Sequence, residues 1–369
     1  GKLDDAGGPA YLAEMANATP STRNLLAYAK AIRNKALERS MIATGTAITG
    51  LGYDNTGMSI DEKIAEAQQA VMAIGETREE AALLDTNTAL REWLDLVDRR
   101  FQGEETGGLM TGFADIDART NGLKNQDLIL IAGRPSAGKT AFAMNIAQNV
   151  AIEQRKPVLV FSMEMSGLGL WERLGASLAG IPLEHLARGT LRDEDWPKLS
   201  AAVQKAKNAP LYIDERAALS INQIQATARR LHRKQPLSLI VVDYLQLAKA
   251  KADGREREVG AISAGLKALA KELNLPLIAL SQLNRDLEKR TNKRPINADL
   301  IYFLYRDEVY NENSQQKGIC EAICSKFRNG KIGTDYLASR LEYSRFDTLS
   351  KPYQAPDPEP PRSRRGLDY

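Results

Sequence analysis

One stretch constrains the fold of this chain more than any other, the eight residues from Gly133 to Thr140. They read Gly-Arg-Pro-Ser-Ala-Gly-Lys-Thr and fit the phosphate-binding pattern G-x-x-x-x-G-K-[ST]. The apolar run 128–132 before the loop is typical of a buried strand, and residues 141–146 after it are typical of a helix. A strand, this loop and a helix in that order predict an α/β domain that binds a nucleotide.

The loop also predicts which atoms meet the nucleotide. Its glycines let backbone N–H groups turn toward a phosphate, and the helix N-terminus adds positive potential. Lys139 brings a full charge to the β- and γ-phosphates, and Thr140 offers a hydroxyl to Mg²⁺. We therefore expect ATP and Mg²⁺ as cofactors. The expected nucleotide-binding residues are Gly133, Arg134, Pro135, Ser136, Ala137, Gly138, Lys139 and Thr140.

The length and composition of the chain set wider limits. At 369 residues with 43% hydrophobic content, the chain can form more than one domain and a sizeable core. It has no apolar run near the roughly 20 residues of a membrane span and no signal peptide at its start, so we expect a soluble cytoplasmic protein. Its two cysteines, Cys320 and Cys324, lack partners at metal-ligand spacing and are expected to be buried thiols. A net charge of +3 does not by itself indicate a polyanionic partner.

Four regions follow along the chain. Residues 1–80 are predicted to form a partial helical domain, a hairpin of helices near 25–37 and 60–74 with a Gly-rich turn at 50–54. Residues 81–108 hold one separate amphipathic helix, 90–101, between polar or Gly-rich connectors. Its apolar stripe must be covered, either by its own domain, which the spacing alone favours, or by a neighbouring subunit. The Pro-rich segment 351–369 is predicted to be a disordered tail.

Residues 109–350 alternate between strand-like and helix-like runs, which indicates a mainly parallel sheet covered on both faces. One helix is predicted to begin with the capping box Ser220-Ile221-Asn222-Gln223. The predicted strands are 128–132, 158–161, 237–242, 277–280, 301–304 and 318–324.

Polar side chains stand at the ends of three predicted strands, where a doubly wound sheet binds ligands. Asp243 ends an apolar run in the manner of a Walker B aspartate and is expected to hold Mg²⁺ beside Thr140. Glu164 is the best placed carboxylate to polarise the water that attacks ATP; the alternative is a capping or salt-bridged Glu. Gln282 is expected to contact the γ-phosphate; the alternative is a Gln bonded only to backbone.

Basic residues form three further candidates. Lys326 and Arg328 follow the last predicted strand on the same side, and we expect them to serve the ATP of a neighbouring subunit; the alternative is a solvated turn. Two basic loops follow the strands that end in Asp243 and Gln282, and they either contact a nucleic-acid backbone or form a solvated surface. The DNA-contact candidates in these loops are Lys249, Lys251, Arg255, Arg285, Lys289 and Arg290.

Together these residues give the chain a specific resemblance to the bacterial and phage DnaB-type replicative helicases. The resemblance runs from Gly7 to Phe346. The motifs that carry it, beside the phosphate loop, are Thr111-Gly112-Phe113 with Asp115-Ile116-Asp117, Phe161-Ser162-Met163-Glu164-Met165, Asp193-Glu194-Asp195-Trp196, Val242-Asp243-Tyr244-Leu245-Gln246-Leu247, Leu266-Lys267-Ala268-Leu269-Ala270 with Glu272-Leu273, Ala279-Leu280-Ser281-Gln282-Leu283, Tyr305-Arg306-Asp307-Glu308-Val309-Tyr310 and Lys326-x-Arg328-Asn329-Gly330.

The resemblance implies a RecA-like ATPase in a homohexameric ring, which moves 5′ to 3′ on single-stranded DNA and meets a primase and a helicase loader. Glu164 then takes the role of catalytic base, Gln282 that of γ-phosphate sensor, and Lys326 with Arg328 that of a pair acting in trans. Helix 90–101 matches the linker helix that docks on the adjacent subunit, which reverses the preference from spacing. The N-terminal hairpin matches the second half of the family's N-terminal domain, whose first half is not in this sequence. In the cell, the resemblance implies the nucleoid, or the host cytoplasm for a phage protein.

The chain departs from the family at residues 297–301, which stand where the family carries a longer DNA-facing loop. Either the loop is deleted or its residues are missing from this sequence, which we favour because deletion would leave little chain to join two strands. Two other functions are weighed against a helicase. One is a RecA-like recombinase or regulatory ATPase without unwinding activity, against which the linker helix and hairpin argue. The other is a catalytically silent scaffold, against which the intact ATPase residues argue.

Overall fold

A computed structural model describes residues 25–53, 57–75, 85–103, 107–243, 255–282, 297–311, 313–350 and 353. The chain divides into two compact units, Gly1–Leu94 and Asp95–Tyr369, and each is described by itself. In the described ranges no helix has the length and apolar character needed to cross a membrane. The predicted tail, 351–369, lies outside the described residues except for Tyr353.

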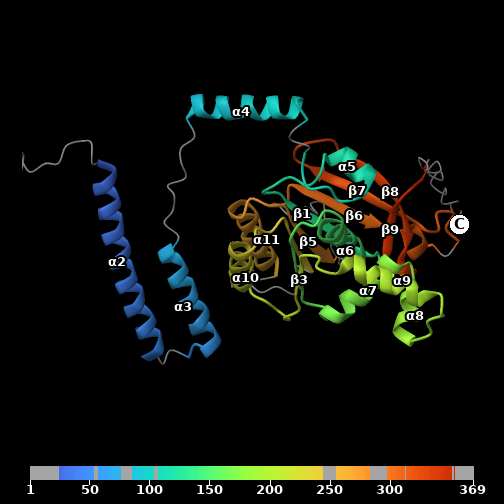
Figure 1. Cartoon of the computed structure of the whole chain (residues 1–369), viewed down its shortest axis with the longest axis horizontal. Coiled ribbons are helices and arrows are strands. Elements are labelled where there is room, and N and C mark those ends of the chain that lie inside the picture. The colour runs from blue at the N-terminus through green and yellow to red at the C-terminus, as the bar shows by residue number, and fades with distance from the viewer. Residues whose placement is uncertain are drawn as a thin grey trace, which may run out of the picture. The chain divides into compact units, whose positions relative to one another are not determined.

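Helices α2 (Leu25–Tyr53) and α3 (Ile60–Gly75) pack against each other in the first unit, which confirms the predicted pair of helices (Figure 1). Ser59 and Glu62 form a capping box at the start of α3, since the hydroxyl of Ser59 and the carboxylate of Glu62 accept each other's backbone N–H. The turn predicted at 50–54 is wrong in its first residues, because α2 continues to Tyr53. The glycines there lie in open space without positive φ, so nothing ends the helix earlier.

Helix α4 (Thr86–Phe101) contains the predicted amphipathic segment, and the boundary between the two units falls inside it. Asp85 caps the helix by accepting the backbone N–H groups of Thr88 and Asn87, and hydrogen bonds from these residues lower the pKa of Asp85. Within the described structure, none of its residues is buried. The exposed apolar side chains are Leu90, Trp93, Leu94, Val97 and Phe101.

The second unit is built on a single sheet, and its described part contains nine strands. The order across the sheet is β3-β2-β4-β5-β1-β6-β7-β8-β9, with parallel pairing from β3 to β6 and antiparallel pairing from β6 to β9. The strands are β1 (Leu128–Gly133), β2 (Val158–Ser162), β3 (Leu211–Asp214), β4 (Leu239–Asp243), β5 (Leu277–Gln282), β6 (Leu300–Tyr305), β7 (Ile319–Phe327), β8 (Gly333–Arg340) and β9 (Arg345–Thr348).

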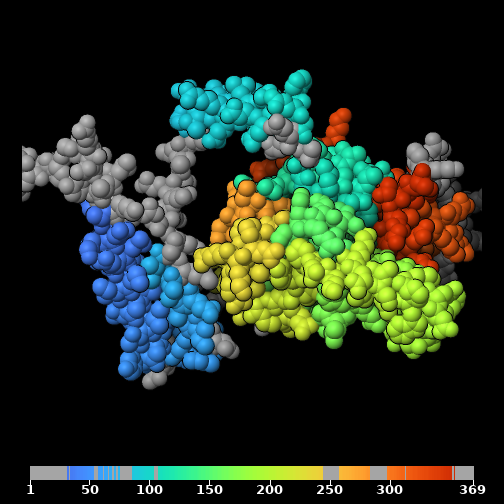
Figure 2. Space-filling view, viewed as in Figure 1, coloured from blue at the N-terminus to red at the C-terminus, as the bar shows by residue number. Residues whose placement is uncertain are grey.

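Helices cover both faces of this sheet, as the sequence predicts. On one face, α5, α6 and α7 pack on Ile129 and Ile131; on the other, α10 and α11 pack on Leu128 and Leu130. Helices α7, α8 and α9 also contact one another and form a lobe on the visible surface, yellow-green in Figure 2. The helices are α5 (Ala114–Thr120), α6 (Lys139–Gln148), the π-helix η2 (Asn149–Glu153), α7 (Gly167–Ala179), α8 (Leu183–Arg188), α9 (Asp195–Ala206), α10 (Ile221–Lys234) and α11 (Arg255–Glu272), with the short 3₁₀ turns η4 (Asp307–Val309) and η5 (Leu341–Tyr343).

All six predicted strands are present, and the capping box of α10 at Ser220 and Gln223 has both of its hydrogen bonds. The prediction missed β3, β8 and β9. Strand β3 has no fully buried residue, and β8 places a buried carboxylate, Asp335, where an apolar residue would have marked the strand. The predicted thiols Cys320 and Cys324 lie buried on β7 as free cysteines.

Candidate active site

The phosphate loop joins the end of β1 to the start of α6, as the pattern predicts. Gly138 immediately precedes α6 with a φ of 92°, a conformation that favours glycine. A Cβ at this position would stand 2.7 Å from Cζ of Phe346, a buried residue of β9. Two constraints therefore favour glycine at position 138, its positive φ and the Phe346 ring, which leaves no room for a Cβ.

Register places the predicted polar residues at the same edge of the sheet. Gly133 on β1 pairs with Gln282 on β5, and Ser162 at the end of β2 pairs with Asp243 on β4. Glu164 follows β2 by two residues and is exposed. We call this side of the sheet, where Gly133, Asp243 and Gln282 end their strands, the phosphate edge.

A cavity of about 700 Å³ opens at the phosphate edge and brings Glu164, Asp243 and Gln282 together with five of the eight residues of the phosphate loop. Arg173 from α7 also lines it and was not predicted, because no strand end or loop pattern marks it. The lining residues predicted from the sequence are Pro135, Ser136, Gly138, Lys139, Thr140, Glu164, Asp243 and Gln282.

Two side chains with oxygen atoms that could bind a metal ion face each other inside this cavity. The hydroxyl of Thr140 donates to Oδ2 of Asp243 at 2.8 Å. The pKa of Asp243 is raised to about 6, chiefly by burial; the charge of Glu164 also acts to raise it, whereas the Thr140 hydrogen bond and the charge of Lys139 act to lower it. A hydroxyl and a carboxylate are ligands that Mg²⁺ accepts, and Mg²⁺ characteristically takes few protein ligands because it keeps waters and phosphate oxygens. The donor set therefore fits Mg²⁺.

Lys139 lies near the same carboxylates. Its Nζ donates to the backbone oxygen of Arg134 at 2.8 Å. Burial lowers the pKa of Lys139, while the charges of Asp243 and Glu164 act in the opposite direction. An anion in the cavity would therefore meet a partly buried lysine already held inside the loop.

A motif after β6 supports the loop from outside. Arg306 donates from Nη1 to the backbone oxygen of Ser136 at 3.2 Å and forms an ion pair with Glu308. The guanidinium carbon of Arg134 stands 4.7 Å from the centroid of the Tyr310 ring, within cation–π range. The sequence contained Arg306, Glu308 and Tyr310 in one motif but did not show that this motif contacts the phosphate loop.

Lys326 and Arg328 do not join the other candidates. Lys326 pairs with Ile301 near the start of β6, and the backbone N–H of Arg328 donates to the carbonyl of Asp299 at 3.0 Å. We call this side of the sheet, where Leu128 and Leu300 begin their strands, the far edge. Five residue steps of about 3.3 Å along β1 put roughly 16 Å between the two edges.

The DNA-contact candidates are not placed. Lys249, Lys251, Arg285, Lys289 and Arg290 lie outside the described residues. Arg255 begins α11, but its side chain is likewise outside them.

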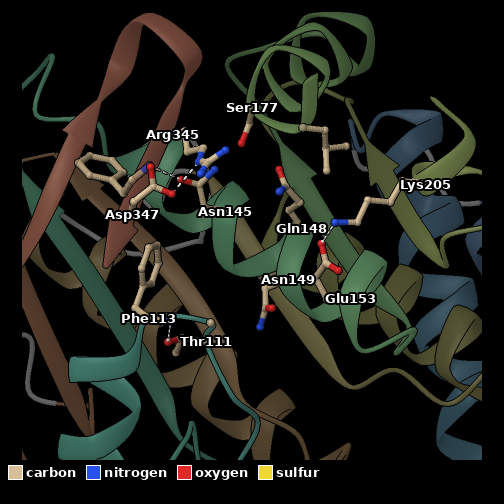
Figure 3. A pocket seen from close by; sticks show the side chains of 13 residues that line it. Thr111, Phe113, Asn145, Gln148, Asn149, Glu153, Ser177, Lys205, Arg345 and Asp347 are labelled. Atoms are coloured by element: carbon tan, nitrogen blue, oxygen red, sulfur yellow. Dashed lines mark hydrogen bonds and ion pairs between the residues drawn. The ribbon is translucent and has the colours of Figure 1, made fainter. Parts of the chain in front are cut away.

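A second cavity, of about 280 Å³, lies beside the C-terminal half of α6 (Figure 3). Its charged side chains pair with each other, Lys205 with Glu153 at 2.6 Å and Arg345 with Asp347 at 2.6 Å. These four charges are paired within the cavity, and no residue of the phosphate loop lines it. The second cavity therefore lacks the loop that identifies the phosphate edge.

Comparisons with known proteins match nearly the whole chain. The family model described as DnaB-like helicase C terminal domain matches residues 108–348, and the DnaB-like helicase N terminal domain matches residues 1–34. The replicative DNA helicase DnaB of Haemophilus influenzae is 43% identical over 374 residues, which cover 95% of this chain and 80% of the relative. The protein of the same name from Geobacillus stearothermophilus is 39% identical over 366 residues, with the same two coverages.

Two solved structures are also similar. One is described as a DnaB-like replicative helicase and its interactions with primase; it has a TM-score of 0.71 and 33% identity, and the match covers 94% of this chain and 85% of that one. The other is described as an ATPase domain; it has a TM-score of 0.64 and 36% identity, and the match covers 70% of this chain and 98% of that one.

Proposed function

The chain belongs to the DnaB-like helicase family and is an ATP-dependent replicative DNA helicase, and from this premise we propose that it works as a homohexameric ring. The ring encircles one DNA strand, moves along it in the 5′ to 3′ direction, and unwinds the duplex ahead. Each ATP is bound at the phosphate edge of one subunit, and the far edge of the next subunit completes this ATP site.

At the phosphate edge, each side chain has a distinct task. The loop N–H groups and Lys139 bind the β- and γ-phosphates, and Thr140 and Asp243 would hold Mg²⁺, which supplies neutralising charge there. Glu164 orients the attacking water and accepts its proton. Gln282, at the end of β5, contacts the γ-phosphate and senses its loss.

The observation that carries the proposal is the separation of Arg328 from its own phosphate loop. A side chain at the far edge cannot cross roughly 16 Å of sheet to reach the nucleotide of its own subunit. The Arg328 side chain is 72% exposed and so is available to another subunit. An arginine supplied in trans stabilises charge in the transition state of phosphoryl transfer.

The remaining partners follow from the family and from exposed surfaces. In the described structure the apolar face of α4 is exposed, and an exposed apolar stripe of this size is typical of a protein interface. The face therefore fits docking on an adjacent subunit. Single-stranded DNA is the proposed ligand of the two predicted basic segments, 249–257 and 284–294, which would bind it mainly through its phosphates. A helicase loader and a primase are proposed partners, the latter because a similar helicase is described together with primase. The proposed location is the cytoplasm, where a replicative helicase meets the chromosome.

Mixed rings test the trans arrangement. Arg328→Ala subunits and Glu164→Gln subunits should each have almost no ATPase activity alone. After random mixing at equal amounts, about a quarter of the interfaces join an intact phosphate edge to an intact far edge, so ATPase activity should reappear at about that level. Arg155→Ala is the control and should stay active without mixing, because Arg155 is an exposed arginine before β2 that donates to the backbone carbonyls of Lys205 and Lys207. Mixtures as inactive as their components would contradict the proposal.

Direction is tested separately with forked substrates. A fork with only a 5′ single-stranded tail should be unwound in an ATP-dependent manner, and a fork with only a 3′ tail should not. Equal unwinding of both forks would contradict the proposed direction, and unwinding of neither would favour the ATPase ring without unwinding activity.

A further inference from the structure

One buried carboxylate at the far edge contacts two cationic side chains from distant parts of the chain. Asp299 precedes β6 and its side chain is 4% exposed. It forms ion pairs with Lys267 of α11 and with Arg328 after β7. The sequence contained Lys267 and Arg328 in two separate motifs and Asp299 in the segment where the chain departs from the family. Lys267 and Asp299 have no task in the function proposed above.

The two oxygens of Asp299 have different partners. Oδ2 accepts the backbone N–H of Leu128 at 2.9 Å and the ammonium group of Lys267. Lys267 also donates to the backbone oxygen of Gln126 at 2.7 Å, and its side chain is only 17% exposed. Oδ1 accepts a hydrogen bond from Nη1 of Arg328 at 3.2 Å. The carboxylate is therefore fixed to the start of β1 through one oxygen and presents the other to Arg328.

Arg328 is held by its backbone and by one nitrogen of its guanidinium group. Its backbone N–H bonds to the carbonyl of Asp299, so residues 299 and 328 are joined by both backbone and side chain. Just before this point the pairing of β6 and β7 shifts, because Ile301 pairs with Lys326 and Tyr302 with Cys324, which leaves Ser325 as a bulge. Bulges redirect the residues that follow them. Most of the guanidinium remains in solvent, so its other N–H groups can reach a ligand.

We propose that Asp299, fixed by Lys267, is a positioning residue that aims Arg328 at the nucleotide of the adjacent subunit. The inference rests on the proposed action of Arg328 in trans. The ion pair with Asp299 limits the rotamers of the long Arg328 side chain before it meets the γ-phosphate. Less conformational entropy is then lost when Arg328 binds there. Asp299 itself touches no nucleotide, so its effect must pass through Arg328.

The steady-state kinetics of Asp299→Asn test this. The amide keeps an acceptor for the Leu128 N–H but gives up the charge that orients Arg328. The kcat of the ATPase should fall about tenfold, while KM for ATP stays at the wild-type value because the phosphate edge is intact. Asp299→Glu, which keeps the charge but moves it by one methylene, should lower kcat as well and serves as the second variant if the amide does not assemble.

A matched control separates positioning from loss of stability. Asp335 has the same 4% side-chain exposure and also binds an arginine, Arg119, but lies away from Arg328. Asp335→Asn should lower the melting temperature as Asp299→Asn does, yet leave kcat per folded ring unchanged. Equal loss of kcat in the control would overturn the inference.

Mixed rings distinguish this inference from the function on which it rests. Asp299→Asn subunits mixed with Glu164→Gln subunits should regain ATPase activity, as Arg328→Ala subunits do. Recovery with Arg328→Ala but not with Asp299→Asn would overturn the role of Asp299 and leave the trans arrangement standing. Recovery with neither would reject the trans arrangement itself.

Discussion

The pair of Arg119 and Asp335 allows a quantitative prediction about the stability of the second unit. Arg119, on α5, donates from Nε and Nη2 to the carboxylate of Asp335 on β8 at 2.7–3.0 Å, and the hydroxyl of Tyr302 donates to the same group at 3.1 Å. The side chains of Arg119 and Asp335 are 22% and 4% exposed. The bonds to Asp335 raise the pKa of Arg119, so the guanidinium stays charged.

Replacing Arg119 by methionine keeps most of the packing but leaves a buried carboxylate without its cation. Removing one partner of a buried ion pair costs about 3–5 kcal/mol. For a unit of this size each kcal/mol shifts the melting temperature by about 2–4 °C, so a decrease of roughly 6–20 °C is expected. The double variant Arg119→Met with Asp335→Leu should recover most of this loss, because no charge then remains buried.

The assay is thermal unfolding of the full chain followed by circular dichroism. Arg192→Met is the matched control, because Arg192 also pairs with a carboxylate, that of Glu194, but the two side chains are 69% and 64% exposed. An exposed pair contributes about 0–1 kcal/mol, so the control should melt within a few degrees of the wild type. Equal shifts for Arg119→Met and Arg192→Met, or a double variant less stable than the single one, would refute the reasoning.

Two further predictions concern the active site and the assembly. Lys139→Ala should abolish ATPase activity and unwinding, because no other described cation of the loop is buried at the phosphate edge; near-normal turnover in that variant would contradict the assignment of the cavity. Trp93→Asp, on the apolar face of α4, should weaken ring assembly, seen as a lower mass in solution by light scattering, while Glu92→Lys on the opposite face should not; an unchanged oligomer in both would show that this face is not an interface.

The residues of the phosphate edge could be predicted because each prediction needed only local sequence. Asp243 and Gln282 end apolar runs, and parallel strands end at the same edge whatever their order. The strands are also recognisable singly, since β1, β2 and β4 are buried along their whole length and are therefore continuously apolar.

The far edge could not be assembled in the same way. Lys267, Asp299 and Arg328 meet only because β1 lies between β5 and β6 and because β7 turns back antiparallel, and the sequence predicted neither the order nor the bulge at Ser325. Strand β8 was not predicted for a related reason. Burial of its Asp335 is favourable only beside Arg119, which lies more than two hundred residues earlier in the chain. Polar groups buried through such long-range pairing leave no periodic signal.

In the proposed trans arrangement, the phosphate loop and Arg328 lie at opposite edges of one sheet, so each subunit contributes a different surface to each of its two interfaces. Such a subunit cannot satisfy both by forming a two-fold pair with a copy of itself; it can only join head to tail, in a closed circle or an open helix. Opening a circle at one interface to admit a DNA strand would then leave one nucleotide without its arginine while the other interfaces stay complete. The subunit whose nucleotide lies at the open interface would therefore be unable to hydrolyse ATP until the circle closes.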